Sequence, residues 1–141
     1  MTVPEGRILV VDDERPIVMV IETNLKISGY DVLTAYNGRD ALELVKSRRP
    51  DLVLLDVVMP EMDGWETLQQ IREDPDPGIA GIPIVMLTAL DRDRDILRGY
   101  DHGVDIYLTK PFEPDELLEI VGRMIEVKRE DEFIDNLGPD I

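Results

Sequence analysis

The sequence predicts a single α/β domain built on a doubly wound, five-stranded parallel sheet with five helices. Two observations favour this fold class. Five short apolar runs are continuous rather than alternating in polarity, as strands buried on both faces of a parallel sheet should be. Segments with helical spacing separate the runs, so the chain repeats a strand–helix unit. A length of 141 residues suits one such domain with its own core.

The expected strands are residues 8–11, 32–35, 52–55, 84–87 and 106–108. Crossovers between parallel strands are right-handed and the connections here are short. The favoured strand order is therefore 2-1-3-4-5, the flavodoxin-like arrangement.

One helix is expected after each strand. Three of them show apolar residues on a single face: Val18, Ile21 and Leu25 in the first, Ala41, Leu42 and Val45 in the second, and Leu117, Val121 and Ile125 in the last. Asp63-Gly64 precedes the third helix, and several arginines near residue 95 indicate an exposed, charged start to the fourth. Residues 74–78, Asp-Pro-Asp-Pro-Gly, are expected as a loop that no helix crosses.

The composition excludes several classes of function. The chain has 15 Lys and Arg against 31 Asp and Glu, a formal charge of −16, which argues against binding to a phosphate backbone. The absence of cysteine excludes a disulfide framework, a thiolate zinc site and a cysteine nucleophile. No segment has the form of a signal peptide or the length of a membrane span. We therefore expect a cytoplasmic protein that binds neither nucleic acid nor membrane.

We expect residues 1–127 to form the folded domain and residues 128–141 to be an acidic C-terminal tail. From residue 126 onward the chain carries six acids and two bases and has little apolar content after Ile134. This composition indicates an extension of the last helix that frays, or the start of a linker. The chain is expected either to act alone or to be a fragment of a longer protein.

Polar residues follow the expected strands near the point where each one ends. Asp12 and Asp13 follow the first strand, Asp56 the third, Thr88 the fourth and Lys110 the fifth. Because the carboxyl ends of parallel strands lie at one edge of the sheet, these side chains should converge in one crevice. Strands 1 and 3 are neighbours in the expected order, which brings the three carboxylates together.

Three ionised carboxylates in one crevice repel each other by about 4 kcal/mol per pair at 4 Å and an effective dielectric near 20. We therefore expect a cation among Asp12, Asp13 and Asp56. The available ligand atoms are all oxygens, and a site with few carboxylates suits Mg²⁺ better than Ca²⁺. A free oxygen of Asp56 could then attack phosphorus, with Lys110 and Thr88 contacting the phosphoryl oxygens.

Four strings resemble the receiver domains of bacterial two-component response regulators, in the order of that family. They are VVDDE at residues 10–14, DVVMPEMDG at 56–64, LTA at 87–89 and GVDIYLTKPF at 103–112. The resemblance covers roughly residues 6–127. It implies a domain that accepts a phosphoryl group from a histidine kinase or a phosphotransfer protein in phosphorelay signal transduction. Such a domain is not a conventional enzyme, although it is expected to catalyse its own phosphorylation and dephosphorylation.

The resemblance also implies a role for each acidic residue of the crevice. Asp56 is the expected phosphoacceptor. Asp12, Asp13 and Asp56, together with the backbone carbonyl of Val58, are the expected ligands of Mg²⁺, and Mn²⁺ is an expected substitute. In an alternative interpretation, Asp12 and Asp13 only cap the following helix.

Three further residues resemble the switching machinery of the family. Thr88 and Lys110 are expected to contact the phosphoryl group, and Tyr107 to change rotamer as the new dianion draws them inward. Lys110-Pro111 is similar to the family's cis peptide bond. The surface formed by the fourth helix, the fifth strand and the last helix is expected to bind an unknown output partner, and a phosphorylation-dependent homodimer stays open.

Two other functions are compatible with an aspartate in such a crevice. A hydrolase of the haloacid-dehalogenase type has a second Asp two residues after its nucleophile, where this chain has Val58. A receiver-like interaction domain without phosphate turnover would lack Asp56, Lys110 or the acidic pair, all of which are present. The sequence therefore favours a phosphorylation-controlled module. It leaves open the kinase, the output partner and the lifetime of the phosphoryl group.

Overall fold

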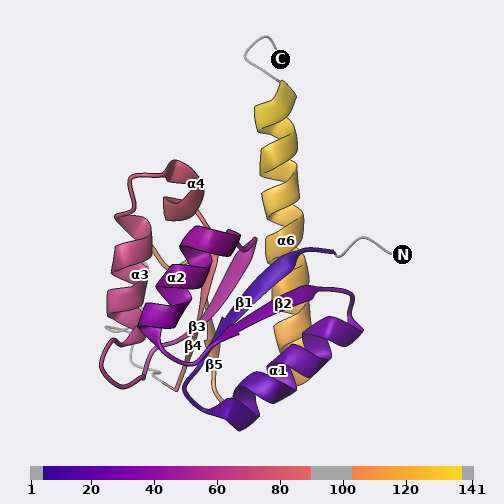
Figure 1. The fold of residues 1–141 in the computed structure, drawn as a ribbon. Helices are drawn as coiled ribbons and strands as arrows, with labels where there is room; N and C mark the ends of the chain where they lie inside the picture. Colours follow the sequence, from indigo (N-terminus) through magenta and orange to yellow (C-terminus); the bar gives the residue numbers. More distant parts are fainter. Residues whose placement is uncertain (1–4, 90–102, 138–141) are drawn as a thin grey trace.

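The sheet has five parallel strands in the order β2-β1-β3-β4-β5, which confirms the predicted order (Figure 1). The structure is a computed structural model and describes residues 5–89 and 103–137. The strands are β1 (Arg7–Val11), β2 (Asp31–Ala35), β3 (Leu52–Asp56), β4 (Ile84–Thr88) and β5 (Ile106–Thr109). Val11 is in register with Leu55, and Asp56 with Leu87, so the carboxyl ends of the central strands lie side by side.

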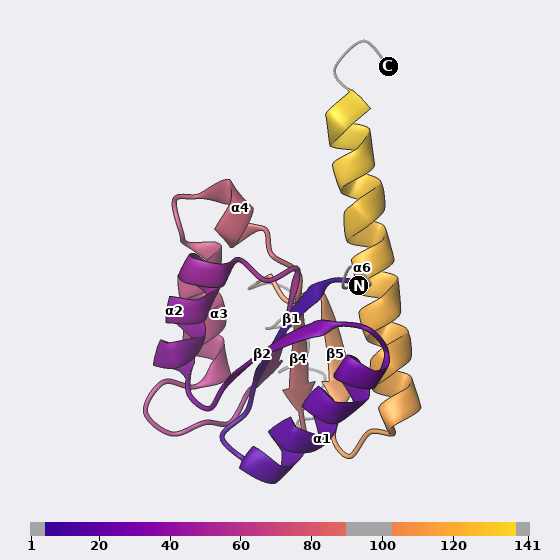
Figure 2. The same cartoon turned by 45° about the vertical axis from the view of Figure 1, so that its right-hand side comes forward.

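Helices cover both faces of this sheet. Those within the described residues are α1 (Arg15–Ile27), α2 (Gly38–Arg48), α3 (Gly64–Arg72), α4 (Pro77–Ala80) and α6 (Pro114–Leu137). Helices α2 and α3 lie on one face, and α1 and α6 lie on the other (Figures 1 and 2). The helix expected after β4 falls on residues 90–102, which lie outside the described residues.

Helix α4 is a single turn that the sequence pattern did not predict. The expected loop at residues 74–78 ends earlier, because Pro77 begins the turn. Proline is tolerated at the first helical position, where its missing N–H has no partner to lose. The carboxylate of Asp76 caps the turn by accepting a hydrogen bond from the N–H of Gly78 at 2.8 Å. No helix crosses the Pro-rich segment, as expected.

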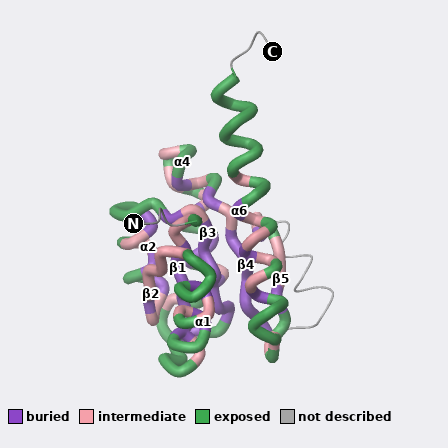
Figure 3. The backbone as a smooth tube through the Cα atoms, turned by 90° about the vertical axis from the view of Figure 1, so that its right-hand side faces the viewer, coloured by how far each residue is buried: buried purple, intermediate pink, exposed green. Residues whose placement is uncertain are grey.

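The strands divide their side chains between two apolar cores. Leu9 and Val11 pack with the α2 and α3 side chains, whereas Ile8 and Val10 pack with those of α1 and α6. The predicted apolar faces of the first and last helices are confirmed, since their named residues are all buried; in α2, Leu42 is only partly buried. Figure 3 shows buried residues concentrated along the strands. The edge strands β2 and β5 are only partly buried, so the prediction of burial on both faces holds for β1, β3 and β4.

Arg72, in the last turn of α3, ties together the segments that lead into β4 and β5. Its guanidinium donates hydrogen bonds to the carbonyls of Gly103 (2.9 Å) and Ile82 (2.7 Å) and pairs with Asp105 at 3.0 Å. The same oxygen of Asp105 accepts the N–H of Ile84 at 2.7 Å. The start of β5, the strand that leads to Lys110, is therefore held against β4 by a shared carboxylate.

Helix α6 runs for 24 residues and passes residue 127 without a break. Lys128 pairs with Asp51 at 2.8 Å and Arg129 with Glu5 at 3.5 Å, so the middle of the helix is fastened to the amino edge of the sheet. From residue 129 to 137 every residue is exposed, and the helix projects beyond the body of the domain (Figure 3). The expected extension of the last helix continues to Leu137 in the structure. Within the described part of the chain, no helix has both the length and the apolar character needed to cross a membrane.

Replacing Asp51 with Asn should destabilise the protein by about 1 kcal/mol near neutral pH and have little effect in strong acid. Burial raises the pKa of Asp51, but the hydrogen bond from Lys128, the N–H of Arg7 and both positive charges together bring it below its ordinary value. The unfolded chain therefore takes up this proton at higher pH than the folded one. The stabilisation is present above about pH 4 and is lost as the pH falls through the lowered pKa.

Denaturant unfolding of the wild type and the variant at both pH values checks this. Asp131→Asn, which changes an exposed acid of α6, is the matched control and should leave stability nearly unchanged. A difference between wild type and Asp51→Asn that does not vary with pH would contradict the prediction.

Candidate functional site

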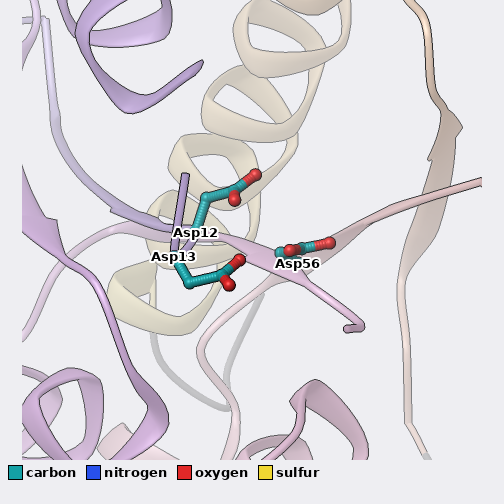
Figure 4. Close-up of side chains that lie close together, drawn as sticks. All are labelled: Asp12, Asp13 and Asp56. Atoms are coloured by element: carbon teal, nitrogen blue, oxygen red, sulfur yellow. The ribbon is translucent and has the colours of Figure 1, made fainter. Parts of the chain in front are cut away.

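The ends of β1 and β3 bring three carboxylates together. Asp12 and Asp13 directly follow β1, and Asp56 is the last residue of β3, the neighbouring strand. One carboxylate oxygen from each lies within 4.8 Å of the others (Figure 4). Asp12 and Asp56 are buried, whereas Asp13 is exposed. The side chains therefore converge as the sequence predicts, and one side of the cluster faces solvent.

Lys110 enters this cluster from the loop after β5. Its ammonium Nζ lies 2.8 Å from Oδ2 of Asp12 and 3.2 Å from Oδ1 of Asp56. The backbone N–H of Lys110 donates to the carbonyl of Thr88 at 2.8 Å, which continues the pairing of β5 with β4. The Lys110–Pro111 peptide bond is cis, as the resemblance implies. Three carboxylates and one ammonium group give the cluster a net charge of −2 when all are ionised.

Burial and the neighbouring charges shift the pKa of two groups at the centre of the cluster, Asp56 and Lys110. Burial raises the pKa of Asp56, and the negative charge of Asp12 raises it further, to about 6, although Lys110 and a backbone hydrogen bond from Val58 oppose the change. Burial alone would lower the pKa of Lys110. Its hydrogen bonds and attraction to Asp12 and Asp56 outweigh that effect and raise the pKa above its ordinary value. Lys110 therefore stays charged, and the site favours additional positive charge.

Asp12 does not act as the cap of α1. The cap residue is Glu14, which makes no side-chain capping bond, and the carboxylate of Asp12 accepts the N–H of Glu14 at 3.0 Å. This bond fixes one oxygen of Asp12 while the other faces Lys110. Asp13 makes no capping bond to α1 either. The capping interpretation therefore does not account for the pair.

Gly64 is a positioning residue that the sequence marks only as a helix start. A Cβ at this position would lie 2.8 Å from Cα of Val57 and closer still to the carbonyl oxygen of Asp56. The N–H of Gly64 donates to the carbonyl of Val57 at 2.8 Å, and Asp63 caps α3 by accepting the N–H of Glu66 at 2.9 Å. Helix α3 can begin directly against the strand end that carries Asp56 only because residue 64 has no side chain. The Asp63-Gly64 pair indicates a helix start in the sequence. The close approach of residue 64 to the backbone of residues 56 and 57 depends on the tertiary structure and has no sequence signal.

Of the remaining predicted residues, Thr88 lies at the same sheet edge, Val58 in the loop that follows β3, and Tyr107 within β5. Thr88 ends β4 and is buried, and Tyr107 in the adjacent β5 is half-buried and packs against the core on the α2 and α3 side. Val58 is exposed in the loop between β3 and α3. Of the surface expected to bind an output partner, β5 and α6 are described, whereas the helix expected before β5 falls on residues 90–102, outside the described part.

The strand order and the cluster of acids with one lysine at its carboxyl edge define an α/β signalling domain of the receiver type. A comparison with protein families agrees: residues 8–122 match the model of the response regulator receiver domain. The chain belongs to this family, the receiver domains of two-component signalling. The family implies a divalent metal site, and the donor set of Asp12, Asp13 and Asp56 fits one, because it offers only carboxylate oxygens within binding distance of each other.

Known proteins similar to this chain include response regulators of similar and of greater length. The probable transcriptional regulator ycf27 of Porphyra purpurea is 43% identical over 132 residues, which are 94% of this chain and 51% of that protein. The chain thus spans about half the length of this relative. The chemotaxis response regulator CheY4 of Vibrio cholerae has a TM-score of 0.79 at 34% identity, covering 84% of this chain and 98% of that one. NtrX from Brucella abortus has a TM-score of 0.84 at 27% identity, covering 94% and 29%.

In metal-free buffer, Asp56→Asn should stabilise the protein at pH 7 by on the order of 2 kcal/mol, because it removes one of the crowded charges. Since the folded pKa of Asp56 is raised to about 6, the folded chain binds this proton more tightly than the unfolded chain. Wild-type stability should therefore fall as the pH rises from about 4 to about 6, and the variant should lack this fall. Denaturant unfolding in EDTA across this range measures both slopes. A variant less stable than wild type at pH 7 would contradict the prediction.

Proposed function

We propose that this receiver domain accepts a phosphoryl group on Asp56 in a Mg²⁺-dependent reaction. The observation that carries the proposal is the position of the Asp56 carboxylate. It belongs to a cluster of three carboxylates that fits a cation, and one of its oxygens lies 3.2 Å from the ammonium group of Lys110. Phosphoryl transfer depends mainly on positioning and charge stabilisation, and the cluster supplies both. With a pKa of about 6, Asp56 is mostly ionised at neutral pH and so can act as a nucleophile.

In the proposed reaction, a carboxylate oxygen of Asp56 attacks the phosphorus atom of the donor. A P–O bond forms as the bond from phosphorus to the leaving group breaks, and the leaving group keeps that electron pair. Lys110 is positioned to neutralise one phosphoryl oxygen, and the hydroxyl of Thr88 can donate to another. Asp12 holds Lys110 at 2.8 Å and thereby keeps the ammonium group at the site before the donor arrives.

We assign the metal ligands to Asp12, Asp13, Asp56 and the backbone carbonyl of Val58. A bound Mg²⁺, or Mn²⁺ in its place, would supply positive charge opposite the phosphoryl oxygens and relieve the repulsion among the carboxylates. The net charge of −2 in the cluster supports this assignment, because Lys110 offsets only one of the three acids.

The donor and output partners follow from the family. Receiver domains interact with histidine kinases and output domains, and we propose a histidine kinase or a phosphotransfer protein as the donor for this chain. Phosphorylation would draw Thr88 and Lys110 together and change the rotamer of Tyr107, altering the surface of β5, α6 and the helix expected from the sequence after β4. The domain would act in the cytoplasm, without binding nucleic acid or membrane itself. Residues 1–127 would be the phosphoacceptor unit and residues 128–141 a tail, either free or leading to an effector, as the longer ycf27 relative suggests.

Intact mass after incubation with a small acyl phosphate and Mg²⁺ tests the reaction. The wild type should gain the mass of one phosphoryl group, and Asp56→Asn should gain none, because the amide is not a nucleophile toward phosphorus. Asp51→Asn is a matched control: it changes a partly buried acid paired with a lysine at the opposite edge of the sheet, and should be phosphorylated like wild type. A wild type without adduct would leave only an interaction domain. Rapid turnover of unrelated phosphate esters would instead support a hydrolase.

Mg²⁺ should raise the melting temperature by a few degrees, since binding at ten times Kd contributes about 1.4 kcal/mol. Thermal unfolding with and without the ion measures the shift, and Asp13→Ala should remove most of it. If saturating Mg²⁺ has no effect while Asp13→Ala itself raises the melting temperature, the repulsion is real but the metal assignment is wrong.

A further inference from the structure

Arg15, the first residue of α1, lies over the aromatic ring of Tyr36, with its guanidinium carbon 4.1 Å from the ring centre. This is a cation–π contact, which holds a positive charge in place without neutralising it. None of the ion pairs among the described residues includes Arg15. The structure therefore fixes a positive charge at this position and leaves it uncompensated.

The strand register places Tyr36 in one row with two acids of the candidate site. The last residue of β1 is in register with the last residue of β2 and with Leu55 of β3. The residues that come next are Tyr36, Asp12 and Asp56. The N–H of Asp12 donates to the carbonyl of the last residue of β2 at 3.2 Å, so the pairing continues one step further. Neighbouring strands lie about 5 Å apart, which puts the Cα atoms of Tyr36 and Asp56 roughly 10 Å from each other.

Tyr36 also lies on the same face of the sheet as these two acids. The strand residues two positions before Asp12 and Asp56 belong to the core beneath α1 and α6, and Tyr36 packs against that core. Because side chains alternate between faces along a strand, all three side chains lie on the face that these helices cover. Lys110 reaches the acids from the β5 side. Arg15 and Lys110 therefore stand at opposite ends of one row.

The position of Arg15 does not stabilise α1. The first turn of a helix carries the positive end of its dipole, where a cation is unfavourable, and the first turn of α1 holds no acid to offset it. Lys110 is already held by two carboxylates, whereas Arg15 has no carboxylate partner in the described part of the chain. An anionic donor must approach a chain with a formal charge of −16. An uncompensated cation beside the site attracts such a donor.

We infer that Arg15, positioned by Tyr36, selects phosphoryl donors by their charge. It favours small donors whose phosphoryl group carries two negative charges, such as acyl phosphates, over donors with a smaller charge. The inference rests on the proposed phosphorylation of Asp56. Arg15 acts through its electric field as the donor approaches and is not a catalytic residue. The field is sensitive to salt, because the Debye length is about 10 Å at 0.1 M ionic strength.

Rates of adduct formation with two donors test the inference. Acetyl phosphate carries two negative charges at pH 7 and phosphoramidate carries one. With saturating Mg²⁺ and low salt, Arg15→Gln should slow the reaction with acetyl phosphate about fourfold and that with phosphoramidate about twofold, since the attraction scales with the donor's charge. Both effects should vanish at 1 M ionic strength, where the Debye length is about 3 Å. Intact mass recorded over time measures the rates.

The controls separate a local charge effect from a change in overall charge or folding. Arg15→Lys should keep the wild-type rates. Arg39→Gln removes the same charge from the first turn of α2, on the opposite face of the sheet, and should change either rate less than twofold. Tyr36→Phe should behave like wild type, whereas Tyr36→Leu should lose at least half of the advantage that Arg15 gives. Melting temperatures show that each variant is folded.

The possible results distinguish this inference from the proposed function. A wild type that is phosphorylated while Arg15→Gln matches it with both donors would overturn the role of Arg15 and leave phosphorylation of Asp56 standing. An equal loss with both donors that salt does not alter would also overturn it, because that result indicates a structural effect. Wild-type behaviour of Tyr36→Leu would overturn the positioning by Tyr36. A wild type that forms no adduct with either donor would overturn both.

Discussion

Two buried carboxylates share one ammonium group in this protein, and the rest of the site depends on that arrangement. Asp12 and Asp56 are brought together because β1 and β3 are neighbours in the sheet, and Lys110 reaches both from the end of β5. One positive charge cannot satisfy two buried negative charges and the exposed Asp13 beside them. Burial and, after it, the negative charge of Asp12 raise the pKa of Asp56, and Lys110 offsets them only in part. The cluster therefore favours a further cation. Such a cation can reach it from the solvent side, where Asp13 is exposed.

The two edges of the sheet use charged residues in opposite ways. At the carboxyl edge, acids outnumber the lysine and the groups are largely buried. At the amino edge each acid has its own base: Arg7 pairs with Asp31, and Lys128 pairs with Asp51, in partly exposed positions. The balanced pairs fasten secondary-structure elements together, whereas the unbalanced cluster is held in place by the surrounding fold. This contrast separates the paired charges that fasten elements together from the crowded charges of the candidate site.

Most of the fold and the composition of the site could be predicted because both depend on periodicity. Continuous apolar runs indicated parallel strands, and parallel strands bring Asp12, Asp56 and Lys110 to one edge. The features that escaped prediction depend on contacts between distant residues or on context. The requirement for glycine at position 64 comes from the backbone of the preceding strand. The composition after residue 127 left a helix extension and a linker open, and the structure continues α6 to Leu137.

Helix α6 connects the two ends of the molecule as a single rod. It begins three residues after Pro111, beside the charged cluster, and its 24 residues extend roughly 36 Å to the far side of the domain. The ion pairs of Lys128 and Arg129 hold it at a point beyond its middle. The buried Leu117, Val121 and Ile125 pack its first half against the sheet. Any rotation of this packed half is carried by the same continuous helix to the projecting half. Events at one edge of the sheet are thereby geometrically linked to the orientation of whatever lies beyond the other.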